Sequence, residues 1–186
     1  ILHTQNIKNS YDKPKTFRRA KQMSNPDLWR FALSVYKLDG VAPACLYLQE
    51  TASVDVPLLL CAAFTCRQGL HFTPDHFNDL HNLTGRWQEE IVQNLRAIRQ
   101  RLKSAPKPAP TAATEALRSQ VKAAELAAEK IQLAVMQDWV DHLRANNLPV
   151  NNVPVGDQQP DLQQMSAVLG LVVSASKKTE PDEMQK

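Results

Sequence analysis

The segment from Glu115 to about Asn146 constrains the fold most strongly, because it runs for about 32 residues without glycine or proline. Alanine, glutamate, lysine and leucine dominate this segment, and all four have high helix propensity. At 1.5 Å per residue, it predicts a single helix about 48 Å long. We therefore expect an all-α fold that contains a long amphipathic helix in its C-terminal half.

Two apolar stripes run along this predicted helix. The main seam has heptad-like spacing and consists of Leu117, Val121, Ala124, Ala128, Ile131, Val135 and Trp139. The opposite side carries Leu126, Leu133 and Val140 at intervals of seven. With the main seam buried in the domain, the second stripe remains as an exposed line that engages a protein partner or a second copy. The alternative is that a short helix near the C-terminus covers Leu126 and Leu133.

The residues before the long helix hold repeated helix-start signals. Asn25-Pro26-Asp27, Asp55-Val56-Pro57 and Thr73-Pro74-Asp75 each combine a capping residue with an early proline. Together with Pro43 and the stop at Asp39-Gly40, they predict helices over residues 26–38, 43–49, 55–67, 74–83 and 86–103. The first helix should be buried on more than one side, since apolar residues cover more than half of its circumference.

Two connections complete the predicted domain of about six helices over residues 23–148. Thr84-Gly85 is expected to break the helix before it, and residues 104–114 alternate proline with small residues, which is typical of an extended linker. The helix between these connections has an apolar seam spaced 4, 4, 3 and 4, formed by Trp87, Ile91, Leu95, Ile98 and Leu102.

The two ends of the chain differ from this domain in composition. Residues 1–22 hold six basic residues and one acidic residue, and Met23 follows them directly. We interpret them as a basic flexible leader that is either an extension or a segment upstream of the biological start. Residues 149–186 are expected to be a mostly disordered tail with a short helix over residues 162–173, where Asp161 is a candidate cap.

Composition excludes several classes of protein. With 43% apolar and 22% charged residues, the chain has globular values, and its three cysteines cannot all pair. No apolar run approaches the roughly 20 residues that a membrane-spanning helix needs. These features predict a cytoplasmic protein with reduced thiols, no membrane association and no cofactor.

Candidate chemistry is sparse. His71, His76 and His81 recur at intervals of five with Asp79 among them, whereas metal ligands on a helix use spacings of three or four. A metal-dependent or small-molecule enzyme near His71, His76 and Asp79 is therefore only an alternative hypothesis.

The cationic residues Arg96, Arg99 and Lys103 fall on one side of the predicted fifth helix, away from its apolar seam. Three aligned cations are suited to a phosphate backbone or an acidic partner. The simpler interpretation is that these cations complement the dipole of the helix end. Nucleic-acid association through this face is thus a second alternative function.

Several separated motifs resemble an uncharacterised family of small bacterial proteins, found mainly in proteobacteria and known only as a domain of unknown function. The motifs are Asp27-Leu28-Trp29-Arg30-Phe31-Ala32-Leu33-Ser34-Val35-Tyr36, Gly40-Val41-Ala42-Pro43-Ala44-Cys45-Leu46, Asp55-Val56-Pro57-Leu58-Leu59-Leu60, and residues 87–103 with Glu90, Leu95, Arg96, Arg99 and Leu102. The resemblance spans about residues 24–146 and supports a start at Met23. It implies no activity, cofactor or catalytic residue, and it does not cover the leader or the tail.

The sequence thus favours an all-α, uncharacterised cytoplasmic protein that acts as a non-catalytic interaction module. The candidate partner-binding residues are Leu126, Leu133, Val140, Arg96, Arg99 and Lys103. The sequence nominates no residue as catalytic, cofactor-binding or metal-binding.

Overall fold

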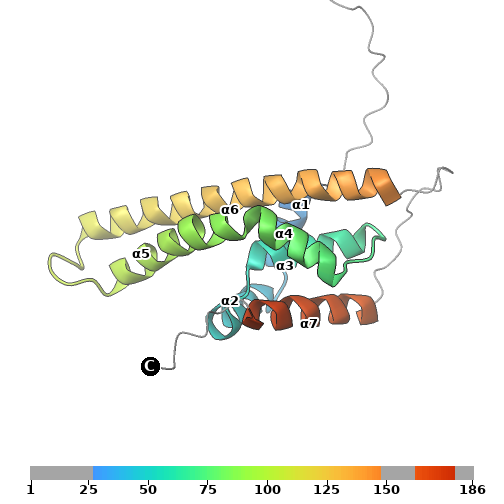
Figure 1. Cartoon of the computed structure of the whole chain (residues 1–186). Coiled ribbons are helices and arrows are strands. Elements are labelled where there is room, and N and C mark those ends of the chain that lie inside the picture. Colours follow the sequence, from blue (N-terminus) through green and yellow to red (C-terminus); the bar gives the residue numbers. More distant parts are fainter. Residues whose placement is uncertain (1–26, 148–161, 179–186) are drawn as a thin grey trace, which may run out of the picture.

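The computed structural model describes residues 27–147 and 162–178, and its architecture is all-α, as the sequence predicts (Figure 1). The helices are α1 (Leu28–Tyr36), α2 (Val41–Ala52), α3 (Val56–Arg67), α4 (Pro74–Trp87), the π-helical turn η1 (Gln88–Val92), α5 (Gln93–Lys103), α6 (Ala112–Asn147) and α7 (Leu162–Lys178). Because α4, η1 and α5 are continuous, the described residues form six helical rods. None of the helices in these two ranges is both long and apolar enough to cross a membrane.

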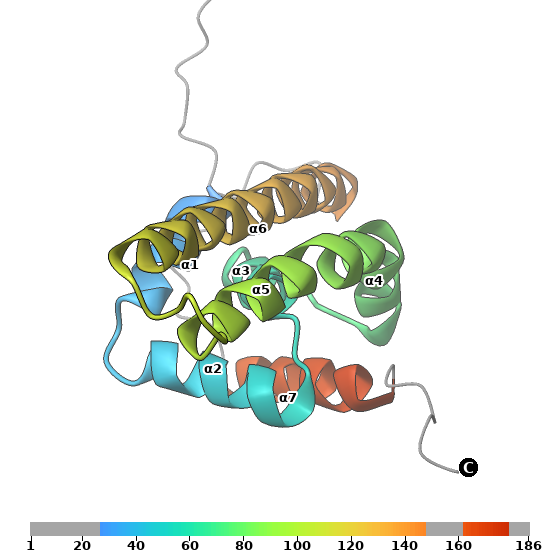
Figure 2. The same ribbon diagram turned by 90° about the vertical axis from the view of Figure 1, so that its left-hand side faces the viewer.

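Helix α3 lies at the centre of the molecule. Every residue from Val56 to Cys66 is buried, and α3 packs against α1, α6 and α7 (Figures 1 and 2). Asp55 is the N-cap of α3, as predicted, and its side chain accepts a hydrogen bond from the Leu58 N–H at 3.1 Å. A helix that is apolar all round is stable only inside a shell of other helices, and the remaining helices form that shell.

The predicted break at Thr84-Gly85 is wrong, because the helix continues through both residues into η1 and α5 (Figure 2). The Thr84 hydroxyl donates to the Leu80 carbonyl oxygen at 2.9 Å, which satisfies it within the helix. Gly85 is buried, and a Cβ atom there would lie 3.0 Å from the ring of His81. The glycine therefore provides room for a neighbouring ring and does not terminate the helix.

Helix α1 is shorter and more exposed than predicted. It begins after Asp27, whose carboxylate accepts from the Arg30 N–H at 3.0 Å. Only Leu28 and Ala32 are buried in it, so it is an amphipathic surface helix and not one buried on several sides.

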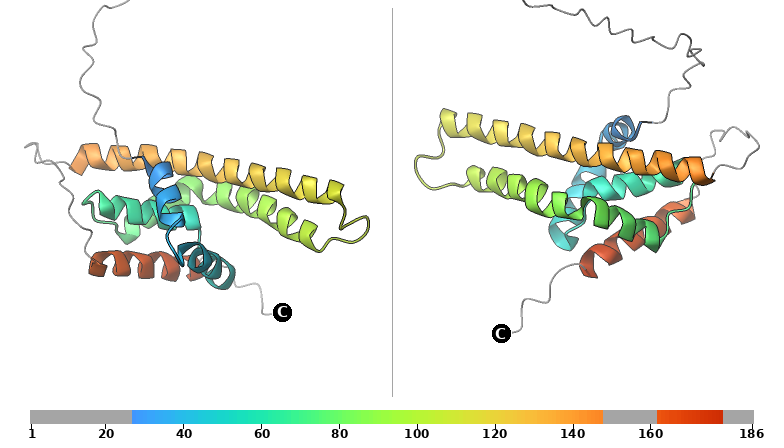
Figure 3. Two further views of the ribbon diagram at one scale, coloured as in Figure 1. Left: turned by 180° about the vertical axis from the view of Figure 1, so that it is seen from behind. Right: turned by 45° about the horizontal axis from the view of Figure 1, so that its top comes forward.

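Helices α5 and α6 form an antiparallel hairpin whose tip extends past the other helices (Figure 3). Helix α6 begins at Ala112 and so includes the last three residues of the predicted linker; the Thr111 hydroxyl oxygen accepts from the Thr114 N–H at 3.2 Å. The connection is thereby shortened to residues 104–111, since a threonine cap at the end of the proline-rich segment starts the helix early.

Helix α7 is longer than the helix predicted over residues 162–173, because it continues to Lys178. Val168 and Val172 are buried in the same apolar core as α3, and α7 packs on α2 and α3. This helix is therefore part of the packed body. The predicted leader and the rest of the predicted tail lie outside the described residues.

Candidate functional sites: a hairpin surface and a polar cavity

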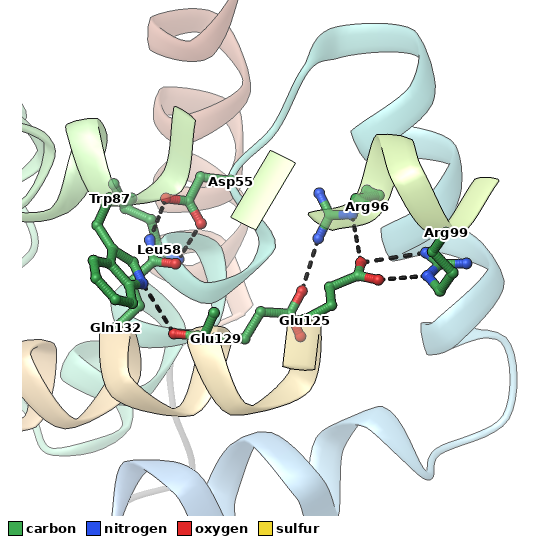
Figure 4. A network of polar contacts seen from close by, with 9 residues as sticks. Asp55, Leu58, Trp87, Arg96, Arg99, Glu125, Glu129 and Gln132 are labelled. Atoms are coloured by element: carbon green, nitrogen blue, oxygen red, sulfur yellow. Dashed lines mark hydrogen bonds and ion pairs between the residues drawn. The ribbon is translucent and has the colours of Figure 1, made fainter. Parts of the chain in front are cut away.

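A network of ion pairs joins α5 to α6 on the side of the hairpin that faces the body (Figure 4). Arg96 donates from Nε to Glu125 Oε1 at 2.9 Å and from Nη2 to Glu129 Oε1 at 2.7 Å. Arg99 donates to both oxygens of Glu125. The side chains of Arg96 and Glu125 are 11% and 8% exposed, so this network is largely removed from water.

These contacts correct the prediction of an outward-facing cationic surface. Arg96 is buried, Arg99 is partly buried and paired, and Lys103 is exposed at the end of α5. The sequence places the three residues on one side of the helix, but that side faces the acidic residues Glu125 and Glu129 of α6. Arg96 and Arg99 therefore form ion pairs within the chain and do not present a free face for a phosphate backbone.

The pKa values within the network follow from its geometry. Burial raises the pKa of Glu125, but the hydrogen bonds from Arg99 and Arg96 outweigh it, and the pKa lies below its ordinary value. Burial raises the pKa of Glu129 above its ordinary value, because its opposing contact with Arg96 is weaker than the cost of desolvation. Glu125 is thus the carboxylate on which the network depends.

The second predicted stripe is not a continuous exposed line. Leu133 and Val140 are 4% and 0% exposed and belong to the core, whereas Leu126 is 50% exposed. The helices that cover this side of α6 are α1 and α3 and not α7, which packs on α2 and α3. Leu126 and Leu133 line a hollow of about 180 Å³ together with residues of α1 and α3, among them Trp29, Leu33, Tyr36 and Leu60.

The two seams that the sequence assigns to the core are partly exposed. The first seam begins at Trp87, the last residue of α4, and continues through η1 and α5. The Trp87 indole N–H donates to the Ala128 carbonyl oxygen in the seam of α6 at 3.1 Å, so the two seams run side by side. Five large residues of these seams are between 37% and 52% exposed: Ile91, Ile98, Leu117, Ile131 and Val135. We call these five residues the hairpin face.

The sequence did not reveal which side of α6 is buried, because two polar residues occupy it. Glu125 and Gln132 are 6% and 1% exposed. Glu125 pairs with Arg96, and Gln132 donates from its amide to Asp55 Oδ2 at 2.7 Å. Because these polar side chains point inward, the main seam lies on a flank of α6, where Ala128 is buried and Trp139 packs against the core while other seam residues are exposed.

Charge is divided unequally between the two ends of the hairpin. Exposed basic residues outnumber exposed acidic ones near its tip, where Arg101, Lys103, Lys107 and Lys122 accompany Glu115. Exposed acidic residues are in excess near the opposite end, where Asp75, Asp79, Glu89, Glu90 and Asp138 accompany Arg86 and Lys130. The hairpin is thus more basic at its tip and more acidic at its other end.

A polar cavity of about 490 Å³ lies on the other side of the α4–α5 rod, between that rod, the start of α3 and α7. Its lining residues are Ser53, Asp55, Leu58, Phe77, His81, Gly85, Gln88, Glu89, Gln93 and Ser176. A second hollow of about 360 Å³ shares Ser53, Gln88 and Gln93 with it. Of the side chains that the structure describes, two carboxylates and no lysine or arginine line the larger cavity.

Asp55 is the most perturbed carboxyl group of this cavity. Desolvation by burial raises its pKa to about 6, although the hydrogen bonds from the Leu58 N–H and from Gln132 oppose the rise. Two side-chain amide oxygens nearby, Gln88 Oε1 and Gln132 Oε1, are buried and have no hydrogen-bond partner among the described residues. Asp55 thus lies among acceptors that the described part of the chain leaves unsatisfied.

The histidines of the alternative metal-site hypothesis do not form a metal-binding cluster among the described residues. The ring of His76 accepts from the Thr73 N–H at 3.3 Å and thus caps α4, while the ring of His81 stacks on Phe77 at 5.9 Å. Among the residues that the structure describes, no group of three or more metal-binding side chains comes together. The thiols of Cys45, Cys61 and Cys66 are buried, and burial raises the pKa of each.

Comparison with known proteins places the chain in a family. A family model described as "Protein of unknown function (DUF2390)" matches residues 27–136, which is more than half of the chain. No curated protein and no solved structure gives a significant match.

Proposed function

Because the chain belongs to this family of unknown function, DUF2390, its role must be argued from its surface, and we propose that it is a non-catalytic protein-interaction module. Its binding surface is the hairpin face, and the partner is a second copy of the same chain. The observation that carries the proposal is a pair of heptad-like apolar seams left open on one side of a two-helix hairpin. Two such hairpins placed face to face make a four-helix bundle.

The size of the surface supports a specific dimer. From Trp87 to Leu102 the seam of α5 spans about 23 Å, and two neighbouring helices present a strip about 20 Å wide. The strip therefore offers roughly 500 Å² of each copy, or about 1,000 Å² in total, which is the lower limit for a specific interface. The predicted dimer is accordingly one of modest affinity that depends on concentration.

Charge complementarity favours a second copy over an unrelated partner. A two-fold axis through the middle of the hairpin face runs the two hairpins antiparallel and places the basic tip of each beside the acidic end of the other. Arg101, an exposed residue of the tip that follows Ile98 by three positions on α5, then lies near Asp138 of the second copy. Such pairing directs association and fixes its orientation.

The test compares two exposed residues on opposite sides of the hairpin. Ile98 lies on the hairpin face and Leu126 lies outside it, and both are 50% exposed. Sedimentation velocity over a range of concentrations should show the unmodified chain in equilibrium between monomer and dimer. Ile98→Glu should be monomeric, whereas the matched Leu126→Glu should dimerise normally, and circular dichroism should show the same helix content in both.

A charge exchange tests the orientation. Arg101→Glu should weaken the dimer by placing like charges together, and adding Asp138→Arg in the same chain should restore it across the two-fold axis. A chain that stays monomeric at every concentration, or equal effects of Ile98→Glu and Leu126→Glu, would show that the hairpin face is not the contact surface.

A further inference from the structure

We infer that the polar cavity beside Asp55 binds a small organic ammonium ion, a primary amine with a short alkyl chain. This site is separate from the hairpin face, and the inference does not depend on dimerisation. Asp55 is the anionic group of the site, Gln88 and Glu89 supply further acceptors, and Leu58 and Phe77 contact the alkyl chain.

The cavity is built from elements that hold its walls in place. The start of α3 contributes Asp55 and Leu58, and α4 contributes Phe77. The π-helical turn η1 begins at Gln88, and its widened geometry brings Gln88, Glu89 and Gln93 to the same hollow. Single π-turns inside α-helices are frequent at functional sites.

The acceptors of the cavity are not saturated by the chain. The carboxylate of Asp55 receives one hydrogen bond from the Leu58 N–H and one from Gln132, whereas an ionised carboxylate can accept about four. Gln88 is 5% exposed and its Oε1 has no hydrogen-bond partner, which is costly for a buried carbonyl oxygen. A ligand rich in N–H donors supplies the bonds that Asp55 lacks, and it reaches the buried Gln88 Oε1 when the Gln88 side chain turns toward the cavity.

The charge of the lining selects a cation. An ammonium group offers three N–H donors and one positive charge, which match the two carboxylates Asp55 and Glu89 and the oxygen of Gln88. Among the described side chains, the lining of this cavity includes no lysine or arginine that would occupy the carboxylates or repel the ligand. An anionic ligand would instead face two like charges.

The apolar part of the lining accounts for the alkyl chain. Leu58 and the ring of Phe77 lie on the walls, and Gly85 has no side chain to fill the space beside His81. The phenyl ring also attracts a cation that lies over its face. The cavity of about 490 Å³ is within the usual size range for a small-molecule site.

The probe for the experiment is n-pentylamine, and n-pentanol is its neutral control of similar size. Titration of the full chain is followed by amide resonances in two-dimensional NMR, including the side-chain amides of glutamine. The amine should give saturable shifts confined to the lining residues, and the alcohol should bind at least tenfold more weakly.

Three variants test the residues that carry the inference. Asp55→Asn keeps the cap of α3, because asparagine caps as well as aspartate, and it should weaken amine binding about tenfold or more. Gln88→Leu should weaken it by a smaller factor. Glu90→Gln is the matched control, since Glu90 belongs to η1 but does not line the cavity, and its binding should be unchanged.

Each outcome decides the inference. Saturable amine binding that Asp55→Asn weakens and Glu90→Gln does not would establish the site. Absence of saturable shifts, equal binding of pentylamine and pentanol, or unchanged binding in Asp55→Asn with a native-like spectrum would overturn it. All these measurements are made on the monomer at low concentration, so failure of the proposed dimer would leave them interpretable.

Discussion

The ion-pair network between α5 and α6 gives the sharpest quantitative prediction. Glu125→Leu removes the carboxylate that accepts from both Arg96 and Arg99. Removing one partner of a buried pair costs about 3–5 kcal/mol, and Arg96 keeps its contact with Glu129, which favours the lower end. Arg99 is 24% exposed and can turn partly toward water, so the loss of its carboxylate partner adds only about 1 kcal/mol.

The expected total is a decrease of about 3–4 kcal/mol in the free energy of unfolding, measured by urea denaturation followed by circular dichroism. For a chain of this size, the melting temperature should fall by roughly 10 °C. The matched control is Glu115→Leu on the same helix, where the carboxylate is 60% exposed and pairs with Arg118. That change should have a much smaller effect, because an exposed ion pair contributes little to stability.

A double-mutant cycle separates the pair from the individual side chains. Arg96→Met combined with Glu125→Leu should show a coupling free energy of at least about 1.5 kcal/mol between the two positions. Equal stabilities of Glu125→Leu and Glu115→Leu would refute the reasoning, because they would mean that the network is no more buried or cooperative than a surface ion pair.

Three further predictions concern the core and the cavity. The pKa of Asp55 is about 6 in the folded chain and about 4 when unfolded, so its carboxyl group stabilises the fold at low pH and this stability is lost as the pH rises through 6. Asp55→Asn should therefore raise the free energy of unfolding at pH 7.5 by up to about 2–3 kcal/mol more than it does at pH 4. Urea titrations at the two pH values measure this difference, and a gain that does not depend on pH would contradict it. Leu133→Ala should cost about 2–5 kcal/mol and Leu126→Ala less than about 1 kcal/mol in the same assay, and equal costs would contradict the assignment of Leu133 to the core. Gly85→Ala should gain little stability from helix propensity, because the added Cβ meets the ring of His81. In a His81→Ala background the same change should stabilise the fold by about 1 kcal/mol in thermal denaturation. An equal effect in both backgrounds would exclude the steric argument.

Local signals in the sequence were enough to predict most helices. Asp55 caps α3 and Thr73 caps α4, as expected from their types and from the prolines that follow them. The length of α6 also follows, to within a few residues, from its composition. These features depend on residues a few positions apart, which a single sequence displays directly.

The orientation of the helices could not be predicted in the same way. Apolar spacing identifies both stripes of α6, but the buried side is decided by contacts across the fold, such as Arg96 with Glu125 and Gln132 with Asp55. A rule that assigns polar residues to the surface therefore chose the wrong side, and it placed Leu133 and Val140 on the surface when they are core. The cavity near Asp55 is likewise formed by residues far apart in the sequence, and no local pattern indicated it.

The burial of α3 also has a consequence for synthesis on the ribosome. Helix α3 ends at Arg67 and needs α7, which begins at Leu162, to cover one of its sides. About 95 residues separate the two, and at 5–20 residues per second their translation takes roughly 5–20 s. For that interval the most apolar helix of the nascent chain lacks one of its covers, so this stretch of translation is when the chain is most exposed to aggregation or to capture by a chaperone.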